Sequence, residues 1–215
     1  MHLILPYVVI LVILLHWFIR KSTKSHDNKE KAFWDREAKA NEVRRQDISK
    51  LNYISIPDNL PLINSGIESL DTFAMQNGRL QRALQTIENL KSKKILNLTG
   101  YSNTDLKLSY GVANLTELTE YDDNFTDLAK ALAMAGHELL ESNASSLARI
   151  YLVYGIDIGS DITSNYVDMG IIYAASEDYE SIKQLITKAE KLNSLSKDSI
   201  IRQLTDILNT YHGNE

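Results

Sequence analysis

The sequence contains no cysteine, and this absence excludes disulfide bonds, thiolate zinc sites and cysteine nucleophiles together. Positive charge is not in excess either, because 23 Lys and Arg stand against 28 Asp and Glu, a net charge of −5. No global positive field therefore points to a nucleic-acid partner. Charged residues form 24% and hydrophobic residues 44% of the 215 residues, which excludes a wholly disordered chain and a membrane protein with several spans. One compact core is expected.

Recognisable catalytic and metal-binding motifs are also missing. The sequence has no G-x-S-x-G, no P-loop and no G-x-G-x-x-G, and we interpret the two glycines within residues 155–159 as the turn at a helix end. His137 lacks a second histidine at the spacing of a zinc-binding helix. Asp122 and Asp123 are interpreted as the start of a helix near Asn124 rather than as an acid–base pair. We therefore expect no metal, no cofactor and a binding role rather than catalysis.

One segment, residues 3–19, is almost continuously apolar and predicts a membrane anchor. Its length is near the lower limit for crossing a hydrocarbon core of roughly 30 Å. Basic residues follow the run and only the terminal amine precedes it, which predicts a single-pass protein of the cell membrane with residues 20–215 in the cytoplasm. A cleaved signal peptide is the competing interpretation. Such a peptide has a charged start and a small-residue cleavage site, and neither is found here.

Charge is distributed unevenly after the apolar run. Residues 20–50 contain ten Lys and Arg against six Asp and Glu, whereas residues 117–190 contain fourteen acidic and four basic residues. A basic neck beside an anionic leaflet is favourable by about 1 kcal/mol per cation. A solvated helix face explains the same segment equally well, because acidic residues interleave with the basic ones at helical spacing. Phe33 and Trp34 either dip into the membrane interface or pack on the domain.

The spacing of apolar residues in the remaining chain predicts an all-α domain. The predicted elements are a polar linker at 22–31, a helix at 31–50, an extended segment at 53–57, two helices within 67–90 that part near Asn77, and a helix within 95–118 capped by residues 103–105. The predicted domains are an anchor at 1–20, a basic juxtamembrane linker and helix at 21–50, an N-terminal helical part at 51–123 and a C-terminal part at 124–215.

The C-terminal part repeats itself at an offset of 34 residues. Each unit places a small residue between large ones, then a turn and a second helix. The matched pairs are Leu132 with Tyr166, Ala135 with Met169, Gly136 with Gly170, and Leu139 with Tyr173. This pattern resembles the tetratricopeptide repeat, and in the second unit the resemblance extends to the Asp-Tyr of the turn at residues 178–179. Ile182 stands where the family prefers alanine, and serines stand where it closes each unit with proline.

The resemblance implies stacked α-hairpins over residues 124–212, with a final helix that caps the stack. It also implies that both repeat glycines lie where two antiparallel helices approach each other. In tetratricopeptide-repeat proteins the first helix of each hairpin lines a groove that holds a peptide or a partner helix. By register, the residues that would line this groove are Lys130, Ala133, His137, Val167 and Ile171.

We therefore expect a membrane-anchored, cytoplasmic helical adaptor that binds a protein or peptide partner and catalyses no reaction. Two alternatives stay open. One is an enzyme of an unrecognised type with its site in residues 51–123. The other is a structural subunit whose groove is filled by its own neighbouring helices.

Overall fold

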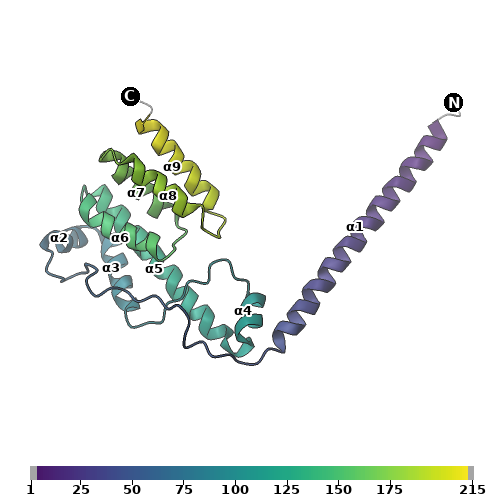
Figure 1. The fold of residues 1–215 in the computed structure, drawn as a ribbon, viewed down its shortest axis with the longest axis horizontal. Helices are drawn as coiled ribbons and strands as arrows, with labels where there is room; N and C mark the ends of the chain where they lie inside the picture. The colour runs from purple at the N-terminus through teal and green to yellow at the C-terminus, as the bar shows by residue number, and fades with distance from the viewer. Residues whose placement is uncertain (1–3, 213–215) are drawn as a thin grey trace. The chain divides into compact units, whose positions relative to one another are not determined.

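The computed structural model describes residues 4–212, and its regular elements within that range are all helices, which confirms the all-α class (Figure 1). The chain divides into two compact units. Unit 1 comprises residues 1–48 and 102–115, and unit 2 comprises residues 49–101 and 116–215. Unit 1 is therefore built from two stretches of chain that lie far apart in the sequence.

Unit 1 contains a long helix, a short helix and a single 3-10 turn. These are α1 (Ile4–Asn41), α4 (Asn103–Tyr110) and η1 (Val112–Asn114). Figure 1 shows α1 in purple as one helix without a break. The predicted linker at 22–31 is therefore wrong, since these residues are helical, and the helix ends at Asn41 rather than near residue 50. No glycine or proline interrupts α1 after Pro6, which lies in the first turn where its missing N–H has no helical partner.

The predicted membrane anchor falls at the start of α1. Residues 1–3 lie outside the described residues, as do most side chains of residues 4–27. The large apolar side chains that are described there, Leu11, Leu14, Leu15 and Phe18, are exposed. Among the residues that the structure describes, no helix combines the length and the apolar character needed to cross a membrane. The anchor at residues 3–19 stays a prediction.

Polar side chains join the C-terminal end of α1 to α4. The Glu37 carboxylate accepts hydrogen bonds from the Lys107 ammonium group and, at 2.8 Å, from the Thr104 hydroxyl. Arg36 forms an ion pair with Asp105 at 2.5 Å. Asp105 is also part of the capping box that begins α4. The predicted cap at residues 103–105 is thus confirmed at Asp105, although the N-cap residue is the preceding serine.

Asn114 at the end of η1 is the buried polar centre of unit 1. Its amide nitrogen donates to the main-chain carbonyls of Gln46 and Tyr110 at 2.8 Å each, and its oxygen accepts from Arg45 Nε at 2.8 Å. Large apolar contributions are few. The buried apolar side chains among the described residues of unit 1 are Ala40, Ile48 and Leu106.

Unit 2 contains seven helices within its described residues. They are α2 (Glu68–Gln76), α3 (Gly78–Leu90), α5 (Leu115–Glu141), whose first residue belongs to unit 1, α6 (Ser145–Asp157), α7 (Thr163–Ala175), α8 (Tyr179–Ala189) and α9 (Lys197–His212). Each helix contributes to one apolar core. Fully buried members of that core are Leu70, Leu84, Leu132, Leu152, Met169, Ile182 and Leu204. α6 packs on α7, and both α7 and α8 pack on α9, as the green and yellow helices in Figure 1 show.

The part of unit 2 before α5 follows the predicted pattern. The two helices expected within 67–90 are α2 and α3, and the Asn77 side chain caps α3 by accepting hydrogen bonds from two of its first amides. Residues 53–57 are not helical, and the Ile54 amide donates to the Ile95 carbonyl at 2.9 Å. Ile54 also packs against the core, so the expected extended segment is confirmed. The helix expected within 95–118 is α4 of unit 1, and it is shorter than predicted, because residues 95–100 are irregular and it ends at Tyr110.

The predicted helix start near Asn124 is wrong, because α5 begins at Leu115 and passes through this position. Asp122 instead accepts a hydrogen bond from the Leu98 amide at 2.9 Å. A carboxylate satisfies an orphan amide in a loop as well as at a helix start, and the local sequence does not distinguish the two.

The two repeat glycines have different surroundings. A β-carbon at Gly136 would lie 2.4 Å from Leu152 Cδ2, so α5 and α6 approach closely there, as expected for the first hairpin. A β-carbon at Gly170 would lie 2.8 Å from Leu204 Cδ2 on α9. Gly170 thus faces α9 and not α8, the second helix of its predicted hairpin. The offset of 34 residues in the sequence does not carry over to equivalent packing at this position.

Candidate functional site

The five residues implied by the resemblance lie on two helices of unit 2. Lys130, Ala133 and His137 belong to α5, and Val167 and Ile171 belong to α7. Lys130 and Ile171 are exposed, and His137 and Val167 are partly exposed. Ala133 is buried and contributes little accessible surface. Four of the five residues are therefore accessible to a partner.

A hydrogen bond joins α5 to α7 at this surface. His137 Nδ1 lies 3.0 Å from Asp168 Oδ2, and the two side chains are 45% and 8% exposed. Burial raises the pKa of Asp168, and the hydrogen bond from His137 opposes that shift. Among the described residues the other ring nitrogen of His137 has no hydrogen-bond partner. The buried carboxylate thus holds the imidazole in one orientation and leaves its second nitrogen available.

Sequence reasoning did not identify Asp168 as part of this site. Its signal in the sequence is that it is the only charged residue of α7. A charge inside an otherwise apolar helix requires a partner when it is buried. The identity of that partner depends on how α5 and α7 pack, and the helical pattern alone does not supply it.

A second polar contact ties α5 to the start of α3. The buried Glu138 carboxylate accepts a hydrogen bond from Asn77 Nδ2 at 2.7 Å. Its other oxygen lies 3.5 Å from Arg79 Nη1. Because Asn77 also caps α3, Glu138 fixes the beginning of that helix against α5.

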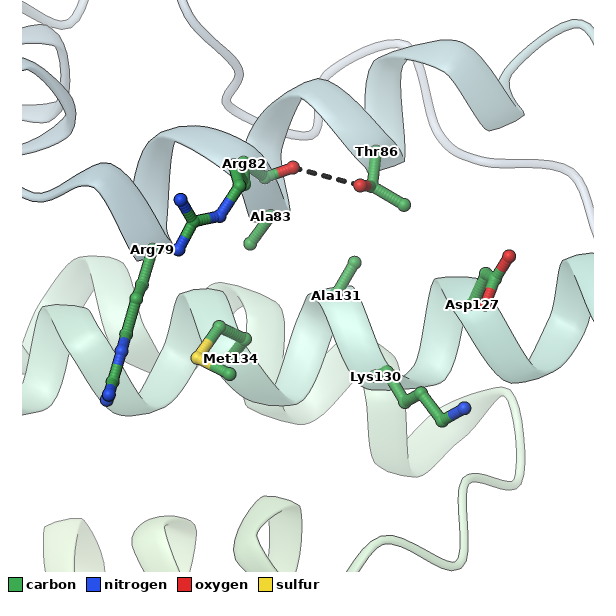
Figure 2. A pocket seen from close by; sticks show the side chains of 8 residues that line it. All are labelled: Arg79, Arg82, Ala83, Thr86, Asp127, Lys130, Ala131 and Met134. Carbon is green, nitrogen blue, oxygen red and sulfur yellow. Dashed lines mark hydrogen bonds between the residues drawn. The ribbon is translucent and has the colours of Figure 1, made fainter.

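A hollow with a volume of about 320 Å³ lies between α3 and α5 (Figure 2). Its lining residues are Arg79, Arg82, Ala83 and Thr86 from α3, and Asp127, Lys130, Ala131 and Met134 from α5. Figure 2 shows Ala83 and Ala131 between the two helices and Arg79 extending from α3 toward α5. Lys130 is thus part of this hollow as well as of the predicted groove.

The hollow and the His137–Asp168 pair are neighbours on α5. Residues three or four apart share one face of a helix, and Lys130, Met134 and His137 follow each other at these spacings. We call the combined region the α5 surface. It consists of Arg79 and Arg82 from α3, Lys130, Met134 and His137 from α5, and Val167 and Ile171 from α7.

A second hollow of about 570 Å³ is lined in part by residues within 51–123, the segment in which the alternative interpretation places an active site of an unrecognised type. It is lined by residues 52–55, Leu96, Asn97, Thr99 and the end of α6. Two of its ionisable groups are engaged in structural contacts. Tyr154 donates to the Ser55 carbonyl at 3.2 Å, and Asp157 forms an ion pair with Lys188 at 2.9 Å.

Within the part of the chain that the structure describes, no three His, Cys, Asp or Glu side chains are grouped so that they could hold a metal ion. Comparisons of the chain with protein-family models, with curated proteins and with solved structures found no match. The described residues thus form an all-α protein with an open, partly apolar and partly cationic surface on α5.

Proposed function

We propose that this protein is a helical adaptor that holds a protein or peptide partner on the α5 surface and catalyses no reaction. The observation that carries the proposal is the composition of that surface. Met134 on α5 and Ile171 on α7 are exposed apolar side chains. Most other apolar side chains of these two helices are buried or partly buried in the core. Exposed apolar side chains rimmed by polar groups are typical of a surface that binds a partner segment.

The arrangement of α5 to α9 supports the tetratricopeptide-like part of the proposal. α5 and α6 follow each other in the chain and approach closely at Gly136, α7 packs on α8, and α9 packs on both α7 and α8. The close approach at Gly136 is the one that the first hairpin of such a repeat requires. The packing of Gly170 on α9 departs from the repeat, so the likeness is better supported in the first unit.

We also propose that residues 3–19 anchor the protein in the cell membrane, with residues 20–215 in the cytoplasm. The apolar run, the basic residues after it and the exposed leucines of α1 support this part. Confinement at a membrane raises the effective concentration of a partner, so that a weak contact on the α5 surface suffices. Protease added outside intact cells should leave unit 2 uncut, and its digestion there would contradict the topology.

One alternative has an observation in its favour. Ala133 is buried and His137 bonds to Asp168, so part of the implied groove is filled by its own helices. The exposure of Ile171, at 38%, opposes a complete filling and favours a partner.

The adaptor function is tested by a charge placed on the exposed apolar residue of α7. Ile171→Glu should abolish the co-purification of a partner that is cross-linked to the full chain in solubilised membranes, because a carboxylate is costly to desolvate in an apolar contact. Ile150→Glu on α6 is the matched control, since Ile150 is 39% exposed and lies outside the α5 surface. Both variants should melt at the temperature of the unmodified protein. Equal capture by the two folded variants would contradict the proposal.

A further inference from the structure

The hollow between α3 and α5 carries a positive charge in an acidic part of the molecule. Three cations, Arg79, Arg82 and Lys130, line it together with one carboxylate, Asp127. Residues 117–190, which include all but the first two residues of α5, contain only four basic residues against fourteen acidic ones. Lys130 is one of those four and lies where two arginines of α3 line the same hollow.

Two of the three cations of the hollow are not neutralised by internal ion pairs. Among the described residues neither Arg82 nor Lys130 has an ion-pair partner. Arg79 lies at 3.5 Å from Glu138, and its side chain is nevertheless 69% exposed. Guanidinium groups in this situation offer fork-shaped donors that match the two oxygens of a carboxylate.

The floor of the hollow is apolar. Ala83 and Ala131 lie between the two helices, and Met134 lies on α5 between Arg79 and Ala131, with a flexible thioether that adapts to a bound side chain (Figure 2). A ligand that fits both the walls and the floor carries a negative charge beside an apolar group. A small inorganic anion would satisfy the cations and leave the floor uncovered.

We propose that this hollow binds an acidic and apolar segment of the partner, with one Glu or Asp carboxylate at Arg82, another at Lys130 and an apolar side chain on Met134. Two carboxylates are needed because Arg82 and Lys130 extend toward opposite ends of the hollow (Figure 2). This inference rests on the proposed function, because it names the chemistry of the segment that the α5 surface holds. The continuity of Lys130, Met134 and His137 along α5 lets one segment of a few residues contact both the cations and Ile171. A peptide therefore fits the geometry better than a lipid headgroup, which would engage the cations alone.

The experiment selects peptides from a displayed library of random 12-residue sequences on the full chain in detergent. The selected sequences should place Glu or Asp next to Leu, Ile, Met or Phe. A synthetic peptide with the selected sequence should bind to the variant Arg82→Glu with Lys130→Glu at least about tenfold more weakly than to the unmodified protein, because its carboxylates then meet like charges. The variant Lys93→Glu with Arg202→Glu makes the same change of net charge at exposed sites outside the hollow and should bind like the unmodified protein.

Three other outcomes would overturn the inference, and they differ in what they say about the adaptor function. In the first outcome, the selected peptides contain no acidic residues and do not bind to the Ile171→Glu variant. This result would support the adaptor function but assign another chemistry to the partner segment. Selection of no peptide at all would overturn both. The third outcome is that phosphatidylserine vesicles bind through Arg82 and Lys130 and displace every selected peptide, whereas phosphatidylcholine vesicles do not. This result would assign the hollow to lipid.

Discussion

Units 1 and 2 are both helical, but different interactions hold their helices together. In unit 1 ion pairs and hydrogen bonds join α1 to α4, and the buried apolar side chains among its described residues are Ala40, Ile48 and Leu106. In unit 2 every helix contributes large apolar side chains to one core. Burial of apolar surface supplies most of the free energy of folding, whereas exposed ion pairs contribute at most about 1 kcal/mol each. Unit 2 therefore has the greater reserve of stability.

This difference shows what polar contacts supply when the apolar contribution is small. Hydrogen bonds and ion pairs are directional, so they fix where α4 lies along α1. The buried Asn114 does the same for the segment that follows α1, because its amide nitrogen donates to the carbonyls of Gln46 and Tyr110 and its oxygen accepts from Arg45. An apolar contact of the same area would tolerate a shift of the helix, and these bonds do not.

The largest expected effect is a volume change in the core of unit 2. Gly136→Leu places a side chain where Leu152 already lies, at 2.4 Å from the new β-carbon, and should destabilise unit 2 by about 3 kcal/mol or more. Urea unfolding of the full chain, followed by circular dichroism, measures this loss. Gly78→Ala is the control, because nothing lies within 4 Å of a β-carbon there, and it should be neutral or stabilising by up to about 1 kcal/mol. Equal midpoints for the two variants would contradict the close approach of α5 and α6.

A smaller effect is expected from a backbone position of unit 1. Gly111 has φ +84°, and a β-carbon there would lie 2.5 Å from the Arg44 carbonyl oxygen. Gly111→Ala should therefore weaken the contact between the segment that follows α1 and the C-terminal end of α4 by about 2 kcal/mol, because neither backbone can move away cheaply. Faster hydrogen exchange of the α4 amides, with unchanged exchange in α7, is the expected result.

Gly66→Ala separates conformational strain from the steric clash in that experiment. Gly66 has φ +87°, and nothing lies within 4 Å of its would-be β-carbon. This variant should show only the strain of a left-handed conformation, about 1 kcal/mol. If Gly111→Ala leaves the α4 amides as protected as before, the close approach of Gly111 to the Arg44 backbone is contradicted.

The smallest effect is the response of the two units to acid, which should have opposite signs. Hydrogen bonds from Ser102, with a further contribution from Arg36, lower the pKa of Asp105 from 3.8 to about 2. Hydrogen bonds from Lys107 and Thr104 lower the pKa of Glu37. A lowered folded-state pKa means that the stabilisation is present above the unfolded value and is lost as pH falls through the folded one. The contact between α1 and α4 should therefore weaken between about pH 4 and pH 2.

Two carboxyls of unit 2, the half-buried Asp122 and the buried Asp168, behave in the opposite way. Burial raises the pKa of Asp122 and of Asp168, so their contribution to stability is present at low pH and is lost as pH rises through the folded-state pKa. Asp178, a partly exposed cap of α8, is an exception in this unit, because hydrogen bonds from Ser181 lower its pKa. Amide exchange as a function of pH should thus show α4 losing protection in acid before α7. Asp105→Asn should reduce the acid dependence of α4, and an unchanged dependence would contradict this assignment.

The sequence predicted those parts of the fold that depend on local patterns. Apolar residues at helical spacing identify α3 and α9, because each of these helices buries one stripe against the core. Unit 1 was not predicted, since its ion pair between Arg36 and Asp105 joins residues 69 positions apart. The segment 22–31 was assigned to a linker because polar residues suit both a loop and a solvated helix. Its helical state depends on continuation from both sides, which a window of ten residues does not reveal.

The candidate site was predictable to a similar degree. The repeat register led to Lys130, His137 and Ile171, which the structure places on exposed or partly exposed parts of α5 and α7. It did not lead to Arg79 and Arg82, because they belong to another helix and approach α5 only through tertiary packing. The ligand chemistry inferred for the hollow depends on that packing and not on any motif.

The unbroken course of α1 means that the number of its residues sets an angle as well as a distance. Along an α-helix each residue turns the chain by about 100° and advances it by about 1.5 Å. One residue inserted between the apolar run and Arg36 would rotate the side chains that hold α4 by about 100° relative to that run. Seven inserted residues would lengthen the helix more and yet restore the orientation to within about 20°. In α1, the number of residues therefore sets the rotation of the side chains that contact α4 relative to the apolar run. In a flexible tether of the same composition, the number of residues would not set this rotation.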